Sequence, residues 1–257
     1  MTVTLRRAYP VIITLYLALT LAGCATTTAN LPPEEPAMHT VSEVDDQTVE
    51  FLEGDPWTGF NHHMYNFNYR FDKYFFIPVV DTYEFILPTF AQTGVSNFYN
   101  NINEFRTLYN SLLQAKGQIA LITLGRFVTN STIGIAGLFD WATPMGMKRH
   151  EEDFGHTLGV WGVSPGPYLV LPVLGPGTCR SATGFVVDSS IHYGMKKLIG
   201  MDRNVDHGNA IVNGLTALKA VDNRHQQPFR YYDSGYPFEY EMVKFLYRQK
   251  RELNVMK

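Results

Sequence analysis

The chain has 257 residues, a formal net charge of −3, and 45% hydrophobic and 14% aromatic residues. This composition supplies one sizeable apolar core, and the mildly acidic balance gives no reason to expect a nucleic-acid partner. With two cysteines in the whole chain, a disulfide framework is excluded as the main source of stability.

The N-terminal segment has the three-part pattern of a secretory signal peptide. Two arginines precede an apolar stretch, Val11–Leu21, that is too short to span a membrane, and Leu21–Cys24 reads LAGC. LAGC is the pattern of a bacterial lipobox, in which the cysteine thiol takes a diacylglyceryl group. We therefore predict a signal peptide over residues 1–23, lipid attachment at Cys24 and no cofactor besides this covalent lipid. Ala25, in place of Asp, favours export to the outer membrane.

The segment that follows is poor in large apolar residues. Residues 24–50 are rich in Thr, Pro and acidic residues, which predicts a flexible tether behind the lipid anchor. A single domain is predicted over residues 51–252, and residues 253–257 form a short tail. With Cys24 acylated, Cys179 has no cysteine left for an intramolecular disulfide.

Aromatic residues at helical spacing begin the domain. Asp55 and Pro56 predict a helix start, with Asp as the cap and Pro in the first turn. The residues that follow at helical spacing are Phe60, Met64, Phe67 and Phe71. Their density fits core packing or a membrane–water interface. Residues 79–87 predict a short helical or extended segment, and residues 93–104 look rich in turns.

The stretch Leu108–Thr143 is the element around which we expect the domain to be organised. Its first part has helical spacing, and Ile119–Val128 is apolar on nearly all sides, so it must be buried in protein or lipid. The stretch could reach across a bilayer, but Arg126 in its middle would cost at least roughly 3 kcal/mol there. We predict two half-length helices that meet at Asn130 and enter one leaflet. The alternative is the buried core of a soluble helical domain.

Glycine and proline dominate residues 155–184 and exclude a long helix there. Tyr168–Leu171 and Val173–Leu174 flank Pro172, which predicts a short apolar loop or hairpin. Helices are expected over residues 188–198, 206–219 and 237–252. The last of these is basic and amphipathic, and its charges are most simply a solvated face.

Candidate catalytic residues are few. His150, Glu151, Glu152, Asp153 and His156 are metal-capable types, but they do not form the His-Glu-x-x-His signature. Cys179 could lie at a helix N-terminus and act as a nucleophile, although no histidine partner can be placed by spacing. Hydrolase, P-loop and dinucleotide fingerprints do not occur, so we do not predict an enzyme.

Taken together, the motifs resemble those of the MlaA (VacJ) lipoproteins of Gram-negative outer membranes. The resemblance runs from Asp55 to about Arg251, and departs at Phe105, Ser181 and Lys244. The matching motifs are Asp55-Pro56-x-x-Gly59-Phe60-Asn61, Tyr65-Asn66-Phe67-Asn68, Ser96-Asn97-Phe98, Arg126-Phe127-x-x-Asn130, Gly134-x-x-Gly137-x-x-Asp140, Asp153-Phe154-Gly155-x-Thr157-Leu158-Gly159 and Gly166-Pro167-Tyr168-x-x-Leu171-Pro172.

The resemblance implies an all-helical, ring-shaped domain in the periplasmic leaflet of the outer membrane, with an amphipathic central channel. Members of this family associate with trimeric porins. They pass mislocalised phospholipid from the outer leaflet to a soluble periplasmic carrier, which feeds an inner-membrane ABC transporter. Phospholipid, a porin and the carrier are therefore the expected partners, and lipid asymmetry is the expected role.

Two groups of residues are candidate sites for this transport. Arg126, Asn130 and Asp140 are the polar residues inside the apolar stretch and are expected to line the channel or support its wall. Arg126 could attract phosphate, or it could brace the ring through an ion pair with Asp140 or Asp153. The second candidate site is a gating loop with glycine hinges, at Gly166, Tyr168, Leu171, Pro172 and Gly175; a rigid turn packed in the core is its alternative.

Two other functions remain open from the sequence. One is a lipoprotein hydrolase or acyltransferase that uses Cys179. The other is a structural lipoprotein that braces the envelope without carrying lipid.

Overall fold

The computed structural model describes residues 55–198, 208–233, 235 and 238–256. These residues belong to one compact unit, Met38–Lys257. The predicted signal peptide, the lipid attachment at Cys24 and the tether lie outside the described residues.

The described chain begins with helical segments that follow one another directly. They are α2 (Thr58–Phe71), the π-helical turn η3 (Asp72–Phe76) and α3 (Ile77–Ile86). The predicted start at Asp55 is early, because Trp57 is the N-cap; the Asp55 carboxylate accepts the Trp57 N–H at 2.9 Å. Pro78 lies in the first turn of α3, directly after the π-helical turn, so its missing N–H falls where the hydrogen-bond pattern of the helix changes.

The prediction of turns over residues 93–104 is wrong, since α4 (Thr89–Leu113) is a continuous helix. Its turn-favouring side chains bond to other elements instead of to the local backbone. Asn101 donates to Ser131 at 2.9 Å, and the Tyr99 hydroxyl donates to the Leu215 carbonyl at 2.7 Å. Tertiary contacts therefore override local turn preference here.

The break predicted at Asn130 falls elsewhere. Helix α5 (Gly117–Thr132) contains Asn130, and it is separated from α4 by a turn in which Ala115 has a φ of 58°. The predicted second half-helix, Ile133–Trp141, is a series of turns. The apolar stretch is thus one helix packed against α4, followed by a folded loop.

The glycine-rich region folds as a short helix and the predicted hairpin. Helix α6 (Phe154–Val160) precedes β1 (Tyr168–Leu171) and β2 (Gly175–Thr178), which pair antiparallel with Tyr168 opposite Thr178. The second arm is therefore not Val173–Leu174, which lies in the turn between the strands. A Cβ on Gly184 would collide with the Gly155 backbone, so this pair of glycines lets α6 approach the next helix closely.

The remaining helices are longer than the sequence predicts. They are α7 (Cys179–Leu198), α8 (Gly208–His225) and α9 (Glu239–Met256). The charges of α9 are not all solvated: Glu239, Glu241 and Lys244 are buried, while the apolar Leu246 is 55% exposed. Glu239 accepts from the Tyr65 hydroxyl at 2.8 Å, and Lys244 pairs with Glu241 at 2.5 Å.

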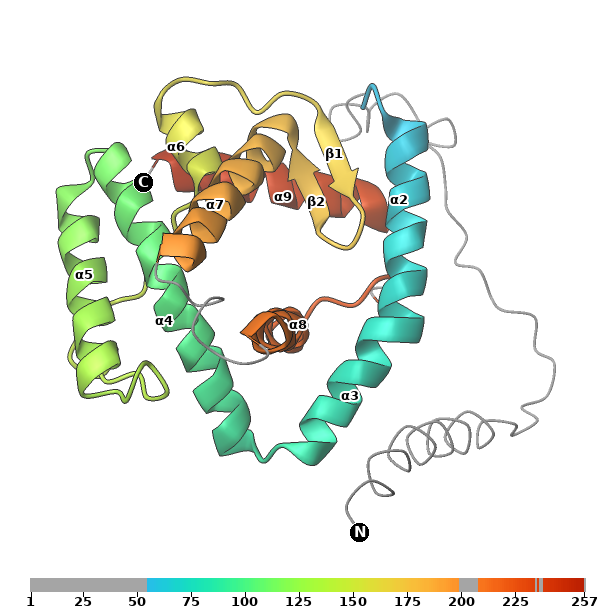
Figure 1. Cartoon of the computed structure of the whole chain (residues 1–257). Helices are drawn as coiled ribbons and strands as arrows, with labels where there is room; N and C mark the ends of the chain where they lie inside the picture. The colour runs from blue at the N-terminus through green and yellow to red at the C-terminus, as the bar shows by residue number, and fades with distance from the viewer. Residues whose placement is uncertain (1–54, 199–207, 234, 236–237, 257) are drawn as a thin grey trace, which may run out of the picture. The chain divides into compact units, whose positions relative to one another are not determined.

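The elements close a circuit of contacts. Helix α2 touches β1, β2 touches α7, α7 packs on α6, and α6 reaches α4, which is joined to α2 through α3 (Figure 1). Helix α8 packs on α3 and α4, α9 packs on α6 and β2, and α5 lies on the outer side of α4 (Figure 1). A core cluster of Tyr65, Tyr168, Val170 and Tyr240 joins α2, the hairpin and α9. The predicted all-helical ring with one apolar hairpin agrees with this arrangement.

Candidate functional site

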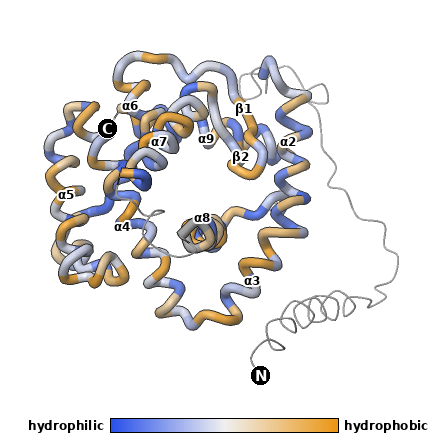
Figure 2. Tube along the Cα trace, viewed as in Figure 1, coloured by the Kyte–Doolittle hydropathy of each residue, from blue (hydrophilic) through white to orange (hydrophobic). Residues whose placement is uncertain are grey.

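Helix α5 is polar on its buried face and apolar on its exposed face. Thr123, Arg126 and Asn130 are buried, whereas Leu121 is 72% and Val128 51% exposed. Figure 2 shows hydrophobic residues along this helix and along α3. A helix on the surface of a protein in water has the opposite distribution.

Exposed apolar side chains continue on neighbouring segments. Phe85 at the end of α3 is 91% exposed and Phe90 at the start of α4 is 80% exposed. The loop after α5 adds Ile133, Ile135, Leu138, Phe139, Trp141 and Met145. An exposed apolar surface of this extent marks contact with lipid or a partner protein. Among the residues that the structure describes, no helix is both long enough and apolar enough to cross a membrane.

Arg126 lies at the centre of a buried polar cluster between α4, α5 and the following loop. Its Nε donates to Glu104 at 2.6 Å, and its Nη2 donates to Asp140 at 3.2 Å. Its Nη1 donates to the Thr143 hydroxyl at 3.0 Å and to the Met147 carbonyl at 2.6 Å. Every guanidinium nitrogen therefore has a partner within the protein.

Asn130 and Asp140 join the same cluster because the loop turns back on α5. Asn130 donates to Asp140 at 3.0 Å and accepts the Ala142 N–H at 3.0 Å. A Cβ on Gly134 would collide with the Asn130 backbone, so glycine is required for this return. Burial would raise the pKa of Asp140, but the hydrogen bonds from Thr143 and Asn130 lower it to about 2. Asp140 is thus a fixed anion that holds the loop to the helix.

The geometry bears on the two roles left open for Arg126. The three predicted residues Arg126, Asn130 and Asp140 come together, and Arg126 pairs with Asp140 but not with Asp153. Its Glu104 partner was missed by sequence reasoning, although Glu104 is the single acidic residue of α4. Since Arg126 and Glu104 are both 2% exposed, the cluster favours the bracing role over direct phosphate binding.

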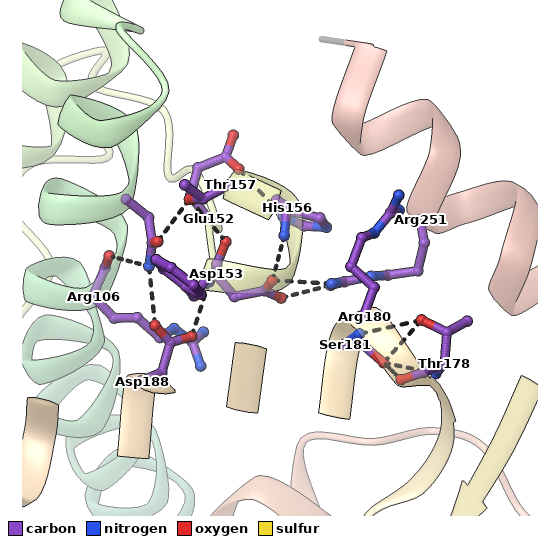
Figure 3. A network of polar contacts seen from close by, with 12 residues as sticks. Arg106, Glu152, Asp153, His156, Thr157, Thr178, Arg180, Ser181, Asp188 and Arg251 are labelled. Carbon is purple, nitrogen blue, oxygen red and sulfur yellow. Dashed lines mark hydrogen bonds and ion pairs between the residues drawn. The ribbon is translucent and has the colours of Figure 1, made fainter. Parts of the chain in front are cut away.

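A second polar cluster connects four helices (Figure 3). The Asp153 carboxylate accepts a hydrogen bond from the His156 N–H at the start of α6. It also accepts hydrogen bonds from two guanidinium nitrogens of Arg251, on α9, at 2.5 and 2.9 Å. Asp188 of α7 accepts from Asn110 of α4 at 3.2 Å. Burial would raise the pKa of Asp153, but the pairing with Arg251 lowers it to about 2. This cluster ties α4, α6, α7 and α9 together.

The metal-capable residues around His150 also serve in packing. Glu152 accepts from Gln114 at 3.1 Å and from Lys116 at 3.2 Å, and its other contact is His156 Nδ1 at 3.2 Å. Over the described ranges, no group of three histidine, cysteine or acidic side chains is placed to hold a metal ion. These residues join α6 to the end of α4.

Two asparagines of α2 attach the hairpin. Asn61 donates to the Tyr168 carbonyl at 3.0 Å and accepts the Val170 N–H at 2.8 Å. One heptad further on, Asn68 donates to the Leu171 carbonyl at 3.0 Å and accepts the Val173 N–H at 2.7 Å. The side chains therefore satisfy the free edge of β1 as a neighbouring strand would.

The predicted gating residues divide into a fixed and an exposed part. Tyr168 is 2% exposed in the core, and Leu171 is half-buried, whereas Pro172 is exposed at the turn. Gly166 and Gly175 have φ of 68° and 79°, the left-handed region that favours glycine. Cys179, at the start of α7, is half-buried beside Gly166, and its N–H donates to the Pro167 carbonyl at 3.2 Å.

Known proteins with similar sequences and folds share a description. A family model described as MlaA lipoprotein matches residues 53–254. The Escherichia coli strain K12 protein named intermembrane phospholipid transport system lipoprotein MlaA is 36% identical over 138 residues, covering 52% of this chain and 55% of the relative. An uncharacterized Rickettsia prowazekii protein is 36% identical over 133 residues, 52% of this chain and 53% of its own length.

The chain therefore spans about half the length of the curated relatives that it matches. A solved structure, from work on the structural basis for maintenance of bacterial outer membrane lipid asymmetry, superposes with a TM-score of 0.63. That pair is 28% identical, and the match covers 79% of this chain and all of the other.

Proposed function

The chain belongs to the MlaA lipoprotein family, and we propose that it removes misplaced phospholipid from the outer leaflet of the outer membrane and passes it toward the periplasm. The names of its relatives from Escherichia coli and Shigella flexneri, which refer to intermembrane phospholipid transport, support this activity. So does the similarity to a structure concerned with outer-membrane lipid asymmetry.

The observation that carries the proposal is the inverted distribution on α5. Its apolar residues, such as Leu121 and Val128, face outward, and its polar residues Arg126 and Asn130 face the protein. In lipid this arrangement buries apolar surface outside and keeps hydrogen-bonded groups inside, away from hydrocarbon. The helical unit is thereby suited to lie in one leaflet with a polar interior.

The proposed mechanism is physical and involves no covalent step. A phospholipid headgroup cannot cross hydrocarbon cheaply, because removing its charge from water costs several kcal/mol or more. A polar path through one leaflet lowers that barrier. Arg126 acts as the brace of the wall, since Glu104, Asp140, Thr143 and Met147 occupy its nitrogens. Asn130 and Asp140 complete the brace and hold the loop to α5.

The hairpin is the proposed gate. Fewer residues move than the predicted gating loop from Gly166 to Gly175 contains. The asparagines of α2 hold β1 and, through the Val173 N–H, the start of the turn, so the strand itself remains attached. Motion is confined to the part of the turn after this bond, where Leu174 is 54% exposed. In this proposal, lipid chains contact the turn and the attached strand forms its fixed base.

Placement and partners follow from the same proposal. A lipid on Cys24 would anchor the chain in the periplasmic leaflet of the outer membrane, behind a flexible tether. The exposed apolar side chains of α3, α5 and the following loop would face lipid and a trimeric porin. A soluble periplasmic carrier would receive the phospholipid.

Lipid carried by the purified protein tests this function. The acylated protein is extracted in a mild detergent, and the non-covalently bound lipid is identified by mass spectrometry. We expect phospholipid in excess of that carried by an unrelated outer-membrane lipoprotein prepared in the same way. Equal amounts would favour the structural lipoprotein that braces the envelope.

A further inference from the structure

Four basic side chains from three helices lie near one another, away from the Arg126 cluster. Arg106 comes from α4, His192 and Lys196 come from successive turns of α7, and Lys219 comes from α8. All four residues are partly buried, so part of each remains accessible to solvent. We call these residues the cationic cluster.

Hydrogen bonds from α4 to Asp188 of α7 fix the position of one helix against the other. Asn110 of α4 donates to Asp188 of α7 at 3.2 Å. Arg106 lies one turn before Asn110, and His192 lies one turn after Asp188. The Arg106 charge acts on the His192 ring, so the two side chains lie near each other. One turn further along, Lys219 reaches α4 from α8 and donates to Asn103 at 2.9 Å.

The residues that the structure describes supply few anions to the cationic cluster. The Arg106 Nε is buried and has no hydrogen-bond partner. Within the part of the chain that the structure describes, none of the four side chains forms an ion pair. Asp188 is the neighbouring carboxylate, and its oxygens already accept from Tyr109 at 2.5 Å, from Asn110 and from the Phe154 N–H at 3.0 Å. In Figure 3, Arg106 and Asp188 are drawn without a hydrogen bond between them.

Electrostatic strain is the consequence of this arrangement. Burial lowers the pKa of Lys219, and the charges of Arg106 and Lys196 lower it further. Burial likewise lowers the pKa of His192, with Lys219, Lys196 and Arg106 adding to the effect. Several cations that repel one another in a partly dry place are stabilised by a bound anion.

We propose that the cationic cluster binds a phosphate group, and that its ligand in the membrane is the phosphate of a phospholipid headgroup. A planar guanidinium, an ammonium group and an imidazole are donors that suit a phosphate with several acceptor oxygens. The identification of the ligand as a lipid rests on the proposed function. The recognition of phosphate rests on the cluster alone.

Binding of short-chain phosphatidylglycerol to the full-length acylated protein in non-ionic detergent tests the inference. Titration calorimetry compares the wild type with Lys219→Gln, Arg106→Gln and Lys197→Gln. Each cation of the cluster contributes a charge-assisted hydrogen bond, so the first two variants should bind about tenfold or more weakly. Lys197→Gln is the matched control, because Lys197 is exposed on α7 over the Tyr193 ring. This variant should bind the lipid as tightly as the wild type does.

A measurement on the unsubstituted protein guards against variants that fail to fold. The imidazole of His192, followed by NMR, should show a rise in its pKa when short-chain phosphatidylglycerol binds, because an anion favours the protonated ring. The same lipid without its phosphate, a short-chain diacylglycerol, should leave that pKa unchanged. An unchanged His192 pKa with bound phosphatidylglycerol, or wild-type affinity in both cluster variants, would overturn the inference.

Two further probes separate the possible sources of phosphate and the two proposals. Inorganic phosphate that competes with phosphatidylglycerol supports a phosphate site. If inorganic phosphate binds and phosphatidylglycerol does not, the assignment to lipid is wrong. If the cluster variants lose binding but gene deletion leaves lipid asymmetry unchanged, the proposed function is wrong and the phosphate site is supported. If gene deletion alters lipid asymmetry but the cluster variants bind as the wild type does, the phosphate site is wrong and the proposed function is supported.

Discussion

Replacing Arg126 with methionine would leave the Glu104 carboxylate without its cationic partner in the interior of the helical unit. Both side chains are 2% exposed, and Glu104 Oε2 has no hydrogen-bond partner even in the unsubstituted protein. Breaking a buried pair by removing one partner typically costs about 3 to 5 kcal/mol. For a domain of this size that corresponds to a fall in Tm of about 10 °C.

The sign of the pH dependence follows from Glu104. Burial raises the pKa of Glu104 above its ordinary value, and the Arg126 hydrogen bond opposes that rise. Removing Arg126 therefore raises the folded-state pKa of Glu104 further above its unfolded value. The folded state then holds a proton that the unfolded state has lost, so stability falls as the pH rises through this interval. Arg126→Met should be less destabilising near pH 5 than near pH 8.

Thermal and urea unfolding of the purified protein in detergent measure this effect. Lys197→Met is the control, because Lys197 is an exposed cation on α7, over the Tyr193 ring, and its loss should cost less than about 1 kcal/mol. The double variant Arg126→Met with Glu104→Leu should recover much of the loss, since the buried Glu104 charge is also removed and Asp140 keeps its hydrogen bonds from Asn130 and Thr143. A cost for Arg126→Met as small as that of the control would refute the bracing role.

Three further predictions concern the anchor, the second polar cluster and the hairpin. Cys24→Ala should leave an unprocessed precursor in the inner membrane, and mass spectrometry of the mature wild type should find acylated Cys24; an unmodified N-terminus elsewhere would exclude the lipoprotein assignment. Asp153→Asn should remove about 2 kcal/mol of stability at pH 7, which the wild type loses as the pH falls from about 4 to 2, because the folded pKa of Asp153 is about 2; parallel acid-unfolding curves would contradict this. Asn61→Ala should cost about 2 to 4 kcal/mol by stranding the Tyr168 carbonyl and the Val170 N–H, and hydrogen exchange at Val170 should rise; unchanged exchange would mean that Asn61 does not hold β1.

Sequence patterns located the elements whose signals are local. The glycine and proline pairs around Tyr168 predicted the hairpin, and the apolar run with Arg126 predicted a helix with a polar group that needs partners. Asp140 and Asp153 were the two predicted partners of Arg126, and the structure pairs Arg126 with Asp140, 14 residues further along the chain. Glu104 was not predicted, because it comes from another helix and no periodicity links the two positions.

The failures have a common physical cause. Asn, Ser and Gly residues in α4 favour turns when considered alone, but Asn101 and Tyr99 find partners in α5 and α8. The charges of α9 were assigned to solvent, yet Glu239 is buried against Tyr65. Both errors arose where contacts distant in sequence decide which face of a helix is buried.

Phospholipid exposed on the cell surface is the quantity that tests the proposed transport most directly. The gene is deleted in the native bacterium, and outer-leaflet phospholipid is labelled with a membrane-impermeant reagent in the parent, the deletion strain and a complemented strain. The account predicts that labelling rises on deletion and returns to the parental level on complementation with the wild-type gene. Equal labelling in parent and deletion strains, with the loss of the protein verified, would contradict it.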